Sequence, residues 1–456
     1  MMQRTKELQA DYLTAVSAFL RINGKNKCLL ESIPRDKGQG RYTIIAWNPV
    51  KEITVEGKLF KISGTPPYQV ADPLKELEKQ ILVSESPVEG LPFQGGGIGY
   101  VGYDVIASYE QLGQIPTDEL GVPDIHFYLF DSYLVFDHIK EQILLVESDS
   151  YSGRSEEELE AALEQTALEL QRVSEAEMKK VTLKKMSYTS NFSKADFQHT
   201  VQKIKQYITA GDMFQMVPSQ RLTAECLNEP FDYYRRLRVE NPSSYLYFID
   251  FTETFIIGSS PERLVSVKDG IVTTNPIAGT RKRGETAEED HRLETELLQD
   301  EKERAEHLML IDLGRNDIGK ISVIGTVEVP TYMIIEKYRF VMHIVSVVTG
   351  KLKKDHTAMD ALKATLPAGT VSGAPKIRAM QRIYELEPVK RGIYAGAVGY
   401  LSKNDQSDFA IAIRTMVIHK GKAYVQAGAG IVYDSDPEKE YEETLQKAKA
   451  LLEVGE

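Results

Sequence analysis

The sequence predicts a protein of the α+β class, in which antiparallel strand hairpins and helices build one body. Residues 28–150 contain β-branched and aromatic runs such as RYTIIAW and FYLFDSYLVFD, separated by glycine, proline, asparagine and aspartate. From residue 191 onward, similar runs are mixed with segments of helical periodicity. Because the two kinds of segment do not alternate as a regular strand–helix–strand series, α+β is favoured over a parallel, doubly wound sheet.

Several helices are indicated by their end signals. Ser155 and Glu158 form a capping-box pattern that opens a charged helix. A second helix begins at Ser193, its apolar residues recur every three or four positions, and a glycine follows its last turn. Further helical patterns cover 286–312 as one long helix and begin again at residue 437.

The chain divides into three predicted regions. Residues 1–150 are mainly of strand character, 151–190 form a charged helix and linker, and 191–456 carry the mixture of strands and helices. A length of 456 residues suits roughly two or three domains, although chains of this size also form one interlocked body.

Composition and charge narrow the class of protein. Hydrophobic residues make up 42% and charged residues 27%, so the chain can bury a core. The formal net charge of −12 argues against broad contact with nucleic acid or with a membrane surface. Cys28 and Cys226 belong to no CxxC pair, which fits a reducing compartment. The N-terminus has no apolar signal core and no run of about 18 apolar residues occurs, so we expect a soluble cytoplasmic protein.

Two phosphate-binding patterns are judged by their context. A literal GxGxxG runs from Gly97 to Gly102, but no helix pattern follows it to receive a pyrophosphate. We therefore interpret it as a glycine-rich strand against which another backbone packs closely. No GxxxxGK[ST] loop occurs, which excludes a Walker-type phosphate site.

Two acidic pairs have the spacing of one helix face. Glu303 and Glu306 lie three residues apart, and so do Glu440 and Glu443. Two such pairs facing each other could hold a hard divalent cation, with water and substrate oxygens completing the shell. Solvated helix faces also carry this spacing, so each pair by itself is an ordinary feature.

Three glycine-containing segments and one arginine are suited to holding an anion. The segments are TTNPIAGTRKRG at 273–284, PAGTVSGAPK at 367–376 and AGAG at 427–430, and the arginine is Arg414. Their backbone N–H groups and side chains can form anion-binding nests, although each is also compatible with an ordinary turn. Together they indicate a substrate with more than one negative group. The residues singled out in the first two segments are Thr280, Arg281, Thr370, Ser372, Gly373 and Lys376.

Two further side chains are candidate acid–base groups. Glu262 follows a strand and a proline in SSPERL, where a carboxyl group is held rigidly. His343 lies in the apolar run RFVMHIVSVV, where a histidine is more often a core residue than a catalytic one. No GxSxG or Cys/His nucleophile signature is present.

Taken together, the motifs resemble those of the chorismate-utilising enzymes, most closely the anthranilate synthase component I group. The resemblance runs from LLES at 29–32 to the final helix. It implies a fold of interlocked antiparallel β-sheets that form a sandwich-like core flanked by helices. The most specific pieces are NPIAGTRKRG, EKERAEHLMLIDLGRND, PAGTVSGAPKIRAMQ, GAVGYL and DSDPEKEYEET.

The resemblance also implies roles for residues. A magnesium ion would be held by helix carboxylates and would bridge to the ring carboxylate of chorismate, with 191–456 as the catalytic region. Glu262 would protonate the departing C4 hydroxyl, and His343 with Thr370 would serve the later elimination. The implied metal ligands are Glu306 and Glu443, supported by Glu303 and Glu440. The implied substrate contacts are Gly279, Thr280, Tyr394, Arg414, Gly428, Ala429 and Gly430.

The implied reaction is that of a lyase. Ammonia attacks C2 of chorismate while the C4 hydroxyl leaves, and loss of the C2 proton and of pyruvate then gives anthranilate. Gln215 occupies the position where isochorismate and salicylate synthases carry a water-activating lysine, and a neutral amide cannot act as that base. Ala278 occupies the position where many aminodeoxychorismate synthases carry a lysine nucleophile. Both positions favour free ammonia and anthranilate.

Ammonia implies a partner. Matching glutaminases use a cysteine in a glycine-rich elbow, and neither NKCLL nor AECLN has that pattern. We therefore expect a separate glutaminase subunit and a hetero-oligomer. The resemblance further implies a feedback site for L-tryptophan, partly within 1–150. Its residues are Leu30, Glu31, Ser32, Arg41, Ser244, Tyr245, Leu246, Val398 and Tyr400.

Two other functions are weighed against this one. The first is aminodeoxychorismate synthase, which retains the pyruvyl arm of its product. The second is a non-catalytic regulator that binds chorismate or an amino acid, although binding alone would not need Glu262, His343 and four metal carboxylates. Nucleic-acid binding by TRKRG is disfavoured, because the chain is acidic and these cations lack interleaved aromatic residues.

Overall fold

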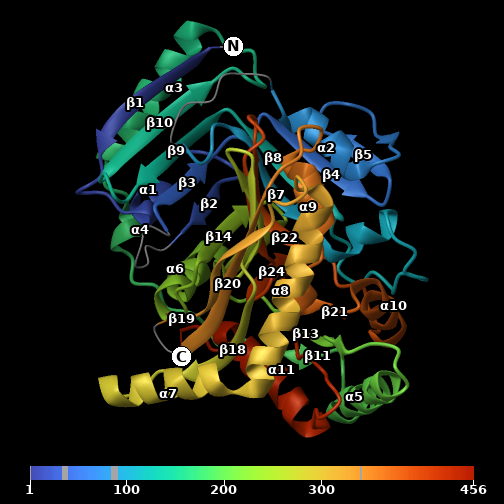
Figure 1. Cartoon of the computed structure of the whole chain (residues 1–456). Helices are drawn as coiled ribbons and strands as arrows, with labels where there is room; N and C mark the ends of the chain where they lie inside the picture. The colour runs from blue at the N-terminus through green and yellow to red at the C-terminus, as the bar shows by residue number, and fades with distance from the viewer. Residues whose placement is uncertain (1, 33–39, 84–90, 339–340, 456) are drawn as a thin grey trace.

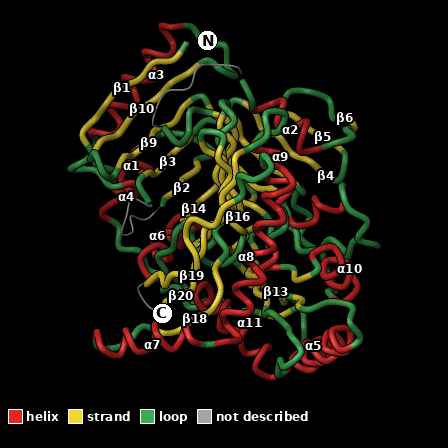
Figure 2. The backbone as a smooth tube through the Cα atoms, in the orientation of Figure 1, coloured by secondary structure: helices red, strands yellow, loops and turns green. Residues whose placement is uncertain are grey.

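Two large antiparallel sheets pack face to face and helices cover their outer faces (Figure 1). The computed structural model describes residues 2–32, 40–83, 91–338 and 341–455. In Figure 2 the strands run through the middle of the molecule and most helices lie around it. The predicted α+β class and the sandwich-like core are confirmed.

The first sheet has eleven strands. In spatial order they are β1 (Gln3–Gln9), β10 (Gln142–Ser148), β9 (Ser132–Asp137), β3 (Tyr42–Ala46), β2 (Cys28–Glu31), β14 (Tyr245–Asp250), β15 (Thr254–Ser260), β24 (Thr415–His419), β25 (Lys422–Gly428), β13 (Ser219–Glu225) and β11 (Thr189–Ser190).

The second sheet has twelve strands. In order they are β18 (Ile277–Lys282), β20 (Val341–Lys351), β17 (Ile271–Thr274), β16 (Arg263–Lys268), β23 (Ser407–Ile411), β22 (Ala397–Ser402), β7 (Gly96–Val101), β8 (Ile125–Phe130), β4 (Lys51–Glu56), β5 (Leu59–Ile62) and β6 (Tyr68–Gln69), with β19 (Glu328–Lys337) beside β20. A short pair, β12 (Gln215–Met216) and β21 (Gly373–Ala374), stands apart.

Three apolar layers hold the sheets and helices together, because alternate residues of each strand face opposite ways. Side chains such as Tyr247 and Tyr100 meet between the two sheets. The outer face of the first sheet packs on α1 (Ala15–Arg21), α3 (Glu156–Gln171), α6 (Pro230–Glu240) and α11 (Pro437–Leu452). The outer face of the second sheet packs on α2 (Pro73–Ile81), α8 (Glu301–Ile321) and α9 (Ala358–Thr365). Of the remaining helices in that apolar layer, α5 (Lys194–Thr209) packs on α11, and α10 (Lys376–Leu386) packs on the short pair β12 and β21.

Strands from both ends of the chain share each sheet. β2 lies between β3 and β14 in the first sheet, and β7 lies between β22 and β8 in the second. The predicted division into 1–150, 151–190 and 191–456 stays a prediction, whereas this sharing of strands is observed.

Local predictions can be compared with the elements. Ser155 caps α3 with the predicted capping box, and Ser193 caps α5. The predicted helix over 286–312 is wrong in one respect, because it is broken at Asp300 into α7 (Ala287–Gln299) and α8. Asp300 has extended backbone angles, and its carboxylate accepts hydrogen bonds from the first N–H groups of α8.

The glycine-rich strand is observed as β7. It is paired on both sides, by β22 and β8. A Cβ atom at Gly99 would lie 2.0 Å from the carbonyl oxygen of His126, so only glycine fits there. The close backbone approach predicted for the GxGxxG segment is therefore confirmed.

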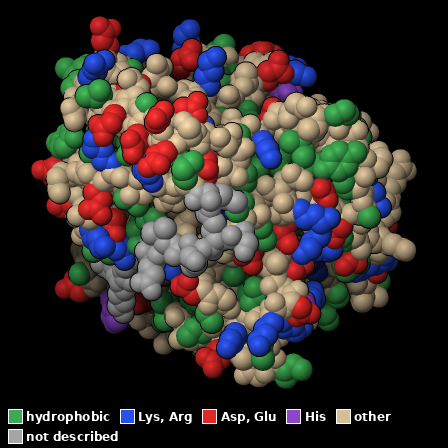
Figure 3. Space-filling model, turned by 90° about the horizontal axis from the view of Figure 1, so that it is seen from above, with side chains coloured by type: hydrophobic (Ala, Val, Ile, Leu, Met, Phe, Trp, Pro, Cys, Tyr) green, Lys and Arg blue, Asp and Glu red, His purple; other side chains and the backbone are tan. Residues whose placement is uncertain are grey.

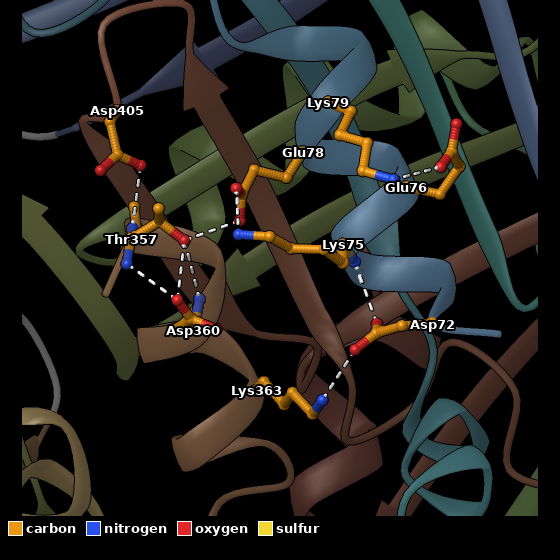
Figure 4. A network of polar contacts seen from close by, with 10 residues as sticks. Asp72, Lys75, Glu76, Glu78, Lys79, Thr357, Asp360, Lys363 and Asp405 are labelled. Atoms are coloured by element: carbon orange, nitrogen blue, oxygen red, sulfur yellow. Dashed lines mark hydrogen bonds and ion pairs between the residues drawn. The ribbon is translucent and has the colours of Figure 1, made fainter. Parts of the chain in front are cut away.

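A polar network joins α2 to α9 over the outer face of the second sheet (Figure 4). Thr357, the N-cap of α9, donates to Glu78 across 2.6 Å, and Lys363 pairs with Asp72 at 2.9 Å. Asp405 accepts a hydrogen bond from the N–H of Ala358 in the first turn of α9. Burial raises the pKa of Asp405 to about 6.

Within the described ranges, no helix is both long and apolar enough to cross a membrane. On the face seen from above in Figure 3, acidic and basic side chains lie among one another, without one broad basic patch.

Candidate active site

A cavity of about 750 Å³ opens where α8 and α11 approach β18, β20 and the ends of several strands. The structure brings nearly all the predicted catalytic, substrate and metal residues into its lining. Ala429 is the exception, because it is fully buried in the apolar layer between two lining glycines. The predicted residues in the lining are Gln215, Glu262, Gly279, Thr280, Glu303, Glu306, His343, Thr370, Tyr394, Arg414, Gly428, Gly430, Glu440 and Glu443.

Four carboxylates enter this cavity from two helices. Glu303 and Glu306 come from α8, and Glu440 and Glu443 come from α11. Burial raises the pKa of Glu303. The hydrogen bond from Arg281 opposes this rise, and the charge of Glu306 adds to it. Burial likewise raises the pKa of Glu440, and the charge of Glu443 adds to it. Like charges gathered in one cavity are stabilised by a cation.

The chemistry of these four carboxylates suits a magnesium ion. Carboxylate oxygens are the hard ligands that Mg²⁺ takes, usually together with several waters and substrate oxygens. Each of three carboxylates has a protein partner: Glu303 faces Arg281 at 3.3 Å, Glu306 faces Gln215, and Glu443 faces Lys447 at 2.7 Å. In the part of the chain that the structure describes, no three acidic, histidine or cysteine side chains already form a metal cluster.

Glu262 is a buried carboxyl group between the two sheets. It lies in the two-residue link from β15 to β16, and its carbonyl accepts a hydrogen bond from the N–H of Ile411 at 3.0 Å. Burial raises the pKa of Glu262 to about 8, although the Thr370 hydroxyl and the charges of Lys447 and Arg414 oppose the rise. The carboxyl is therefore protonated at neutral pH and can donate a proton.

His343 is oriented by the strand beside it. Its Nδ1 lies 2.9 Å from the carbonyl oxygen of Gly279 and 3.0 Å from the hydroxyl of Thr280. A carbonyl oxygen only accepts, so Nδ1 carries a proton, and in the corresponding neutral tautomer Nε2 carries the lone pair. A bulge in β18 between Ala278 and Thr280 makes this geometry, and Gly279 at its centre has a φ of 68°.

The groups suited to a carboxylated substrate line the same cavity. Burial lowers the pKa of the Arg414 guanidinium, which has no hydrogen-bond or ion-pair partner among the described residues. Glycine is needed at Gly428, because a Cβ there would lie 2.6 Å from the carbonyl oxygen of Pro218 and 3.0 Å from the Tyr394 hydroxyl. A Cβ at Gly430 would lie 2.8 Å from Nε2 of the Gln215 side chain.

Some predicted anion-binding residues are placed elsewhere. Arg281 is held by Asp300 at 2.8 Å and by Glu303. Lys376 pairs with Asp317 at 2.5 Å and does not line the cavity. Their charges are therefore already neutralised within the protein. The hydroxyl of Ser372 donates to the Ala368 carbonyl. Of the 367–376 segment, Thr370 and Val371 line the cavity.

Lys447 belongs to the site but was not predicted. It lies one turn after Glu443 on α11, and its Nζ lies 2.7 Å from that carboxylate and 3.1 Å from the carbonyl oxygen of Gly428. The only signal in the sequence is a lysine four residues after a glutamate, which is common on helices.

A second cavity, of about 510 Å³, lies next to the first. Every residue predicted for the tryptophan site lines it. The Glu31 carboxylate is already engaged, since it accepts from Tyr234 and pairs with Arg238 at 2.7 Å. Arg41 pairs with Asp137. The predicted residues in this lining are Leu30, Glu31, Ser32, Arg41, Ser244, Tyr245, Leu246, Val398 and Tyr400.

Comparison with known proteins agrees with this geometry. The family model described as chorismate binding enzyme matches residues 27–453. The chain is 54% identical over 457 residues to anthranilate synthase component 1 of Lactococcus lactis subsp. lactis (strain IL1403), covering 100% of both chains. It is 48% identical over 467 residues to anthranilate synthase component 1 of Acetivibrio thermocellus, covering 99% of this chain and 94% of the relative.

A solved structure is equally similar. The crystal structure of anthranilate synthase component I from Streptococcus pneumoniae TIGR4 matches with a TM-score of 0.86 at 51% identity, covering 98% of this chain and 99% of that chain. The chain therefore belongs to the chorismate-binding enzyme family. Within that family it is an enzyme of the anthranilate synthase type, a chorismate-utilising large subunit of tryptophan biosynthesis. The resemblance predicted from the motifs is confirmed.

Proposed function

We propose that the 750 Å³ cavity binds chorismate and converts it, with ammonia, into anthranilate and pyruvate through aminodeoxyisochorismate. One observation carries this proposal: a buried carboxyl group that is protonated at neutral pH, Glu262, shares the cavity with four helix carboxylates and with Arg414, whose guanidinium has no partner among the described residues. This combination suits a dianionic substrate that has a hydroxyl leaving group.

Substrate orientation follows from the distribution of charge. The Arg414 guanidinium binds the carboxylate of the enolpyruvyl arm, and the Tyr394 hydroxyl and the N–H groups near Gly428 and Gly430 line the same cavity. The ring carboxylate then points toward the acidic helices α8 and α11. Because both carboxylates of the substrate are held, C2 and C4 of the ring have fixed positions.

In the first step Glu262 is the general acid. The ammonia lone pair forms a bond to C2, the ring double bonds shift, and the C4–O bond breaks. The leaving hydroxyl takes the proton of Glu262 and departs as water, which is a far better leaving group than hydroxide. The carboxylate left behind is reprotonated before the next turnover.

In the second step His343 is the general base. Nε2 of its neutral ring accepts the C2 proton, the ring becomes aromatic, and the bond from the ring to the enolpyruvyl oxygen breaks. The departing enolpyruvate takes up a proton and becomes pyruvate. Thr280 and the carbonyl of Gly279 keep the imidazole in the required tautomer.

The four carboxylates Glu303, Glu306, Glu440 and Glu443 would hold a magnesium ion, whose charge would neutralise the ring carboxylate of the substrate. Arg281 and Lys447 partly offset the negative charge of this acidic set.

Two neutral side chains select ammonia as the nucleophile. The Gln215 amide cannot remove a proton from water, and the Ala278 methyl group cannot form a bond to C2. Neutral ammonia is nucleophilic enough to attack C2 without a base, whereas water would need one. We further propose that a glutaminase subunit supplies the ammonia in the cytoplasm, that the two chains form a hetero-oligomer, and that L-tryptophan inhibits by binding in the second cavity.

A direct assay tests the proposed function. The purified chain with chorismate, magnesium and ammonium at mildly alkaline pH is expected to produce blue-fluorescent anthranilate and an equal amount of pyruvate. Accumulation of an aminochorismate without pyruvate would instead indicate the aminodeoxychorismate synthase reaction. Chorismate binding without any turnover would indicate a regulator.

A further inference from the structure

A single wall separates the substrate cavity from the second cavity. Pro261, Ile277 and Tyr338 line both cavities. Next to Pro261 in the chain, Glu262 faces the substrate cavity and Arg263 faces the second one. Successive side chains of an extended chain point to opposite sides, so one peptide unit carries a group into each cavity. This unit is also where the chain passes from β15 in the first sheet to β16 in the second.

Arg263 forms hydrogen bonds with three side chains that line the second cavity. Its Nε lies 2.6 Å from the Tyr245 hydroxyl and 3.2 Å from Asp408, and its Nη1 donates to Asn275 at 3.1 Å. Tyr245 in turn donates to Asp408 at 2.9 Å. A planar guanidinium held by three partners has one well-defined position. The backbone that carries it, and the adjoining Glu262, are therefore held as well.

Asn275 connects this network to the strand that orients His343. It stands two residues before Ile277, where β18 begins, and β18 carries Gly279 and Thr280 into the substrate cavity. On the other side of the link, the Ser244 hydroxyl donates to the carbonyl of Pro261 at 3.1 Å. Residues of the second cavity therefore hydrogen-bond to both chain neighbours of Glu262: Ser244 to Pro261, and Asn275 to Arg263.

Arg263 and Asp408 present a pair of opposite charges to an occupant of the second cavity. The side chains of Arg263 and Asp408 are 28% and 26% exposed, whereas Glu31 and Arg41 are engaged by other partners. The ammonium group of an amino acid would compete with Arg263 for the Asp408 carboxylate, and its carboxylate would compete for the guanidinium. Binding in this cavity therefore rearranges the same hydrogen bonds that hold Arg263.

We propose that Arg263 is a positioning residue that couples the two cavities. An amino acid bound in the second cavity draws the guanidinium away from Asn275 and, through the peptide bond that Arg263 shares with Glu262, displaces the Glu262 carboxyl from its place in the substrate cavity. This proposal rests on the proposed inhibition by L-tryptophan and adds the route by which binding reduces turnover.

The test separates binding from coupling. Calorimetry measures the dissociation constant of L-tryptophan, and the coupling factor is the ratio of kcat/KM for chorismate without tryptophan to that with saturating tryptophan. In Asn275→Ala, tryptophan should bind within about threefold of the unchanged protein, while the coupling factor should fall about tenfold. Thermal unfolding and circular dichroism establish that the variant is folded.

A second variant works in the opposite direction. Asn275→Asp places a carboxylate against Arg263 and holds the guanidinium more strongly, so the dissociation constant of tryptophan should rise about tenfold. Gln406→Ala is the matched control, since Gln406 lines the same cavity but donates to Asp269, which is outside the hydrogen bonds of Arg263. This control should keep the coupling factor of the unchanged protein.

Three results would overturn the coupling role of Arg263. They are an unchanged coupling factor in folded Asn275→Ala, loss of tryptophan binding in that variant, and an unchanged dissociation constant in Asn275→Asp. Failure of the proposed inhibition would look different, because the unchanged protein would then show no binding of tryptophan.

Discussion

Gln215 donates a hydrogen bond from its side-chain Nε2 to Oε1 of Glu306 across 3.0 Å. Gln215 lies in β12 and is only 3% exposed, so packing fixes its amide, while Glu306 projects from α8. The contact orients a proposed metal ligand without adding charge to the acidic cavity. Outer-shell partners of this kind commonly change metal affinity or activity by about 10- to 100-fold when removed.

Gln215→Leu is accordingly expected to raise the magnesium concentration for half-maximal activity about tenfold. Calorimetric titration with magnesium alone should show the same loss of affinity. Gln426→Leu is the control, because Gln426 lines the cavity but bonds to Ser219 instead of a carboxylate. A normal magnesium dependence in Gln215→Leu would remove the proposed role of Gln215.

Glu262 predicts a specific pH dependence. The group acts as an acid, and its pKa is about 8, so kcat should fall as pH rises through about 8. Glu262→Gln has no proton to donate, and its kcat should be about 10²- to 10⁴-fold lower without that alkaline fall. The measurement is a pH profile of kcat at saturating ammonium. A variant that keeps the alkaline limb would show that another group titrates.

The bidentate geometry of the Arg414 guanidinium is expected to matter for chorismate binding. Arg414→Lys keeps the positive charge but loses bidentate geometry, so kcat/KM for chorismate should fall about 100-fold. Arg283→Lys is a matched control outside the cavity, where Arg283 pairs with Asp290 at 2.7 Å. Equal effects of the two substitutions on kcat/KM would argue against a substrate contact at Arg414.

Asp405 predicts a change in stability rather than in activity. Its pKa in the folded protein, about 6, lies above its ordinary value of 3.8, so its contribution to stability is present at low pH and is lost as pH rises through about 6. Asp405→Asn should therefore be more stable than the unchanged protein by about 1–2 kcal/mol at neutral pH. The difference should vanish below about pH 4.

Denaturant unfolding at both pH values measures this difference. Asp355→Asn is the control, because it changes an exposed carboxylate near the same helix and should alter stability little. Destabilisation by Asp405→Asn at neutral pH would show that the charged form of Asp405 is favoured in the network of Figure 4.

Much of the site could be predicted because each motif carries its own local constraint. A spacing of three residues puts Glu303 and Glu306 on one face of α8 in any fold, and a glycine-rich turn exposes N–H groups wherever it lies. The family resemblance then implied which of these segments form one site. The structure adds that Gln215, predicted only for its lack of basicity, bonds directly to Glu306.

Other features depend on tertiary structure that no single segment specifies. Helical periodicity continues across Asp300, so the break between α7 and α8 was missed, although an aspartate followed three residues later by Glu303 is a capping signal. Lys447 resembles an ordinary surface ion pair until β25 is placed beside α11. The wall between the cavities, with Arg263 at its centre, exists only because β15 and β16 belong to different sheets.

The sharing of strands between the two halves of the chain has a practical consequence for protein engineering. A fragment that began at residue 191 would retain β14 without β2 and β22 without β7, leaving an unpaired edge in each sheet. Such long open edges recruit other chains, so the fragment should aggregate instead of yielding a catalytic domain free of the proposed inhibition. Desensitised enzymes of this type are therefore better sought by point substitution in the wall than by truncation.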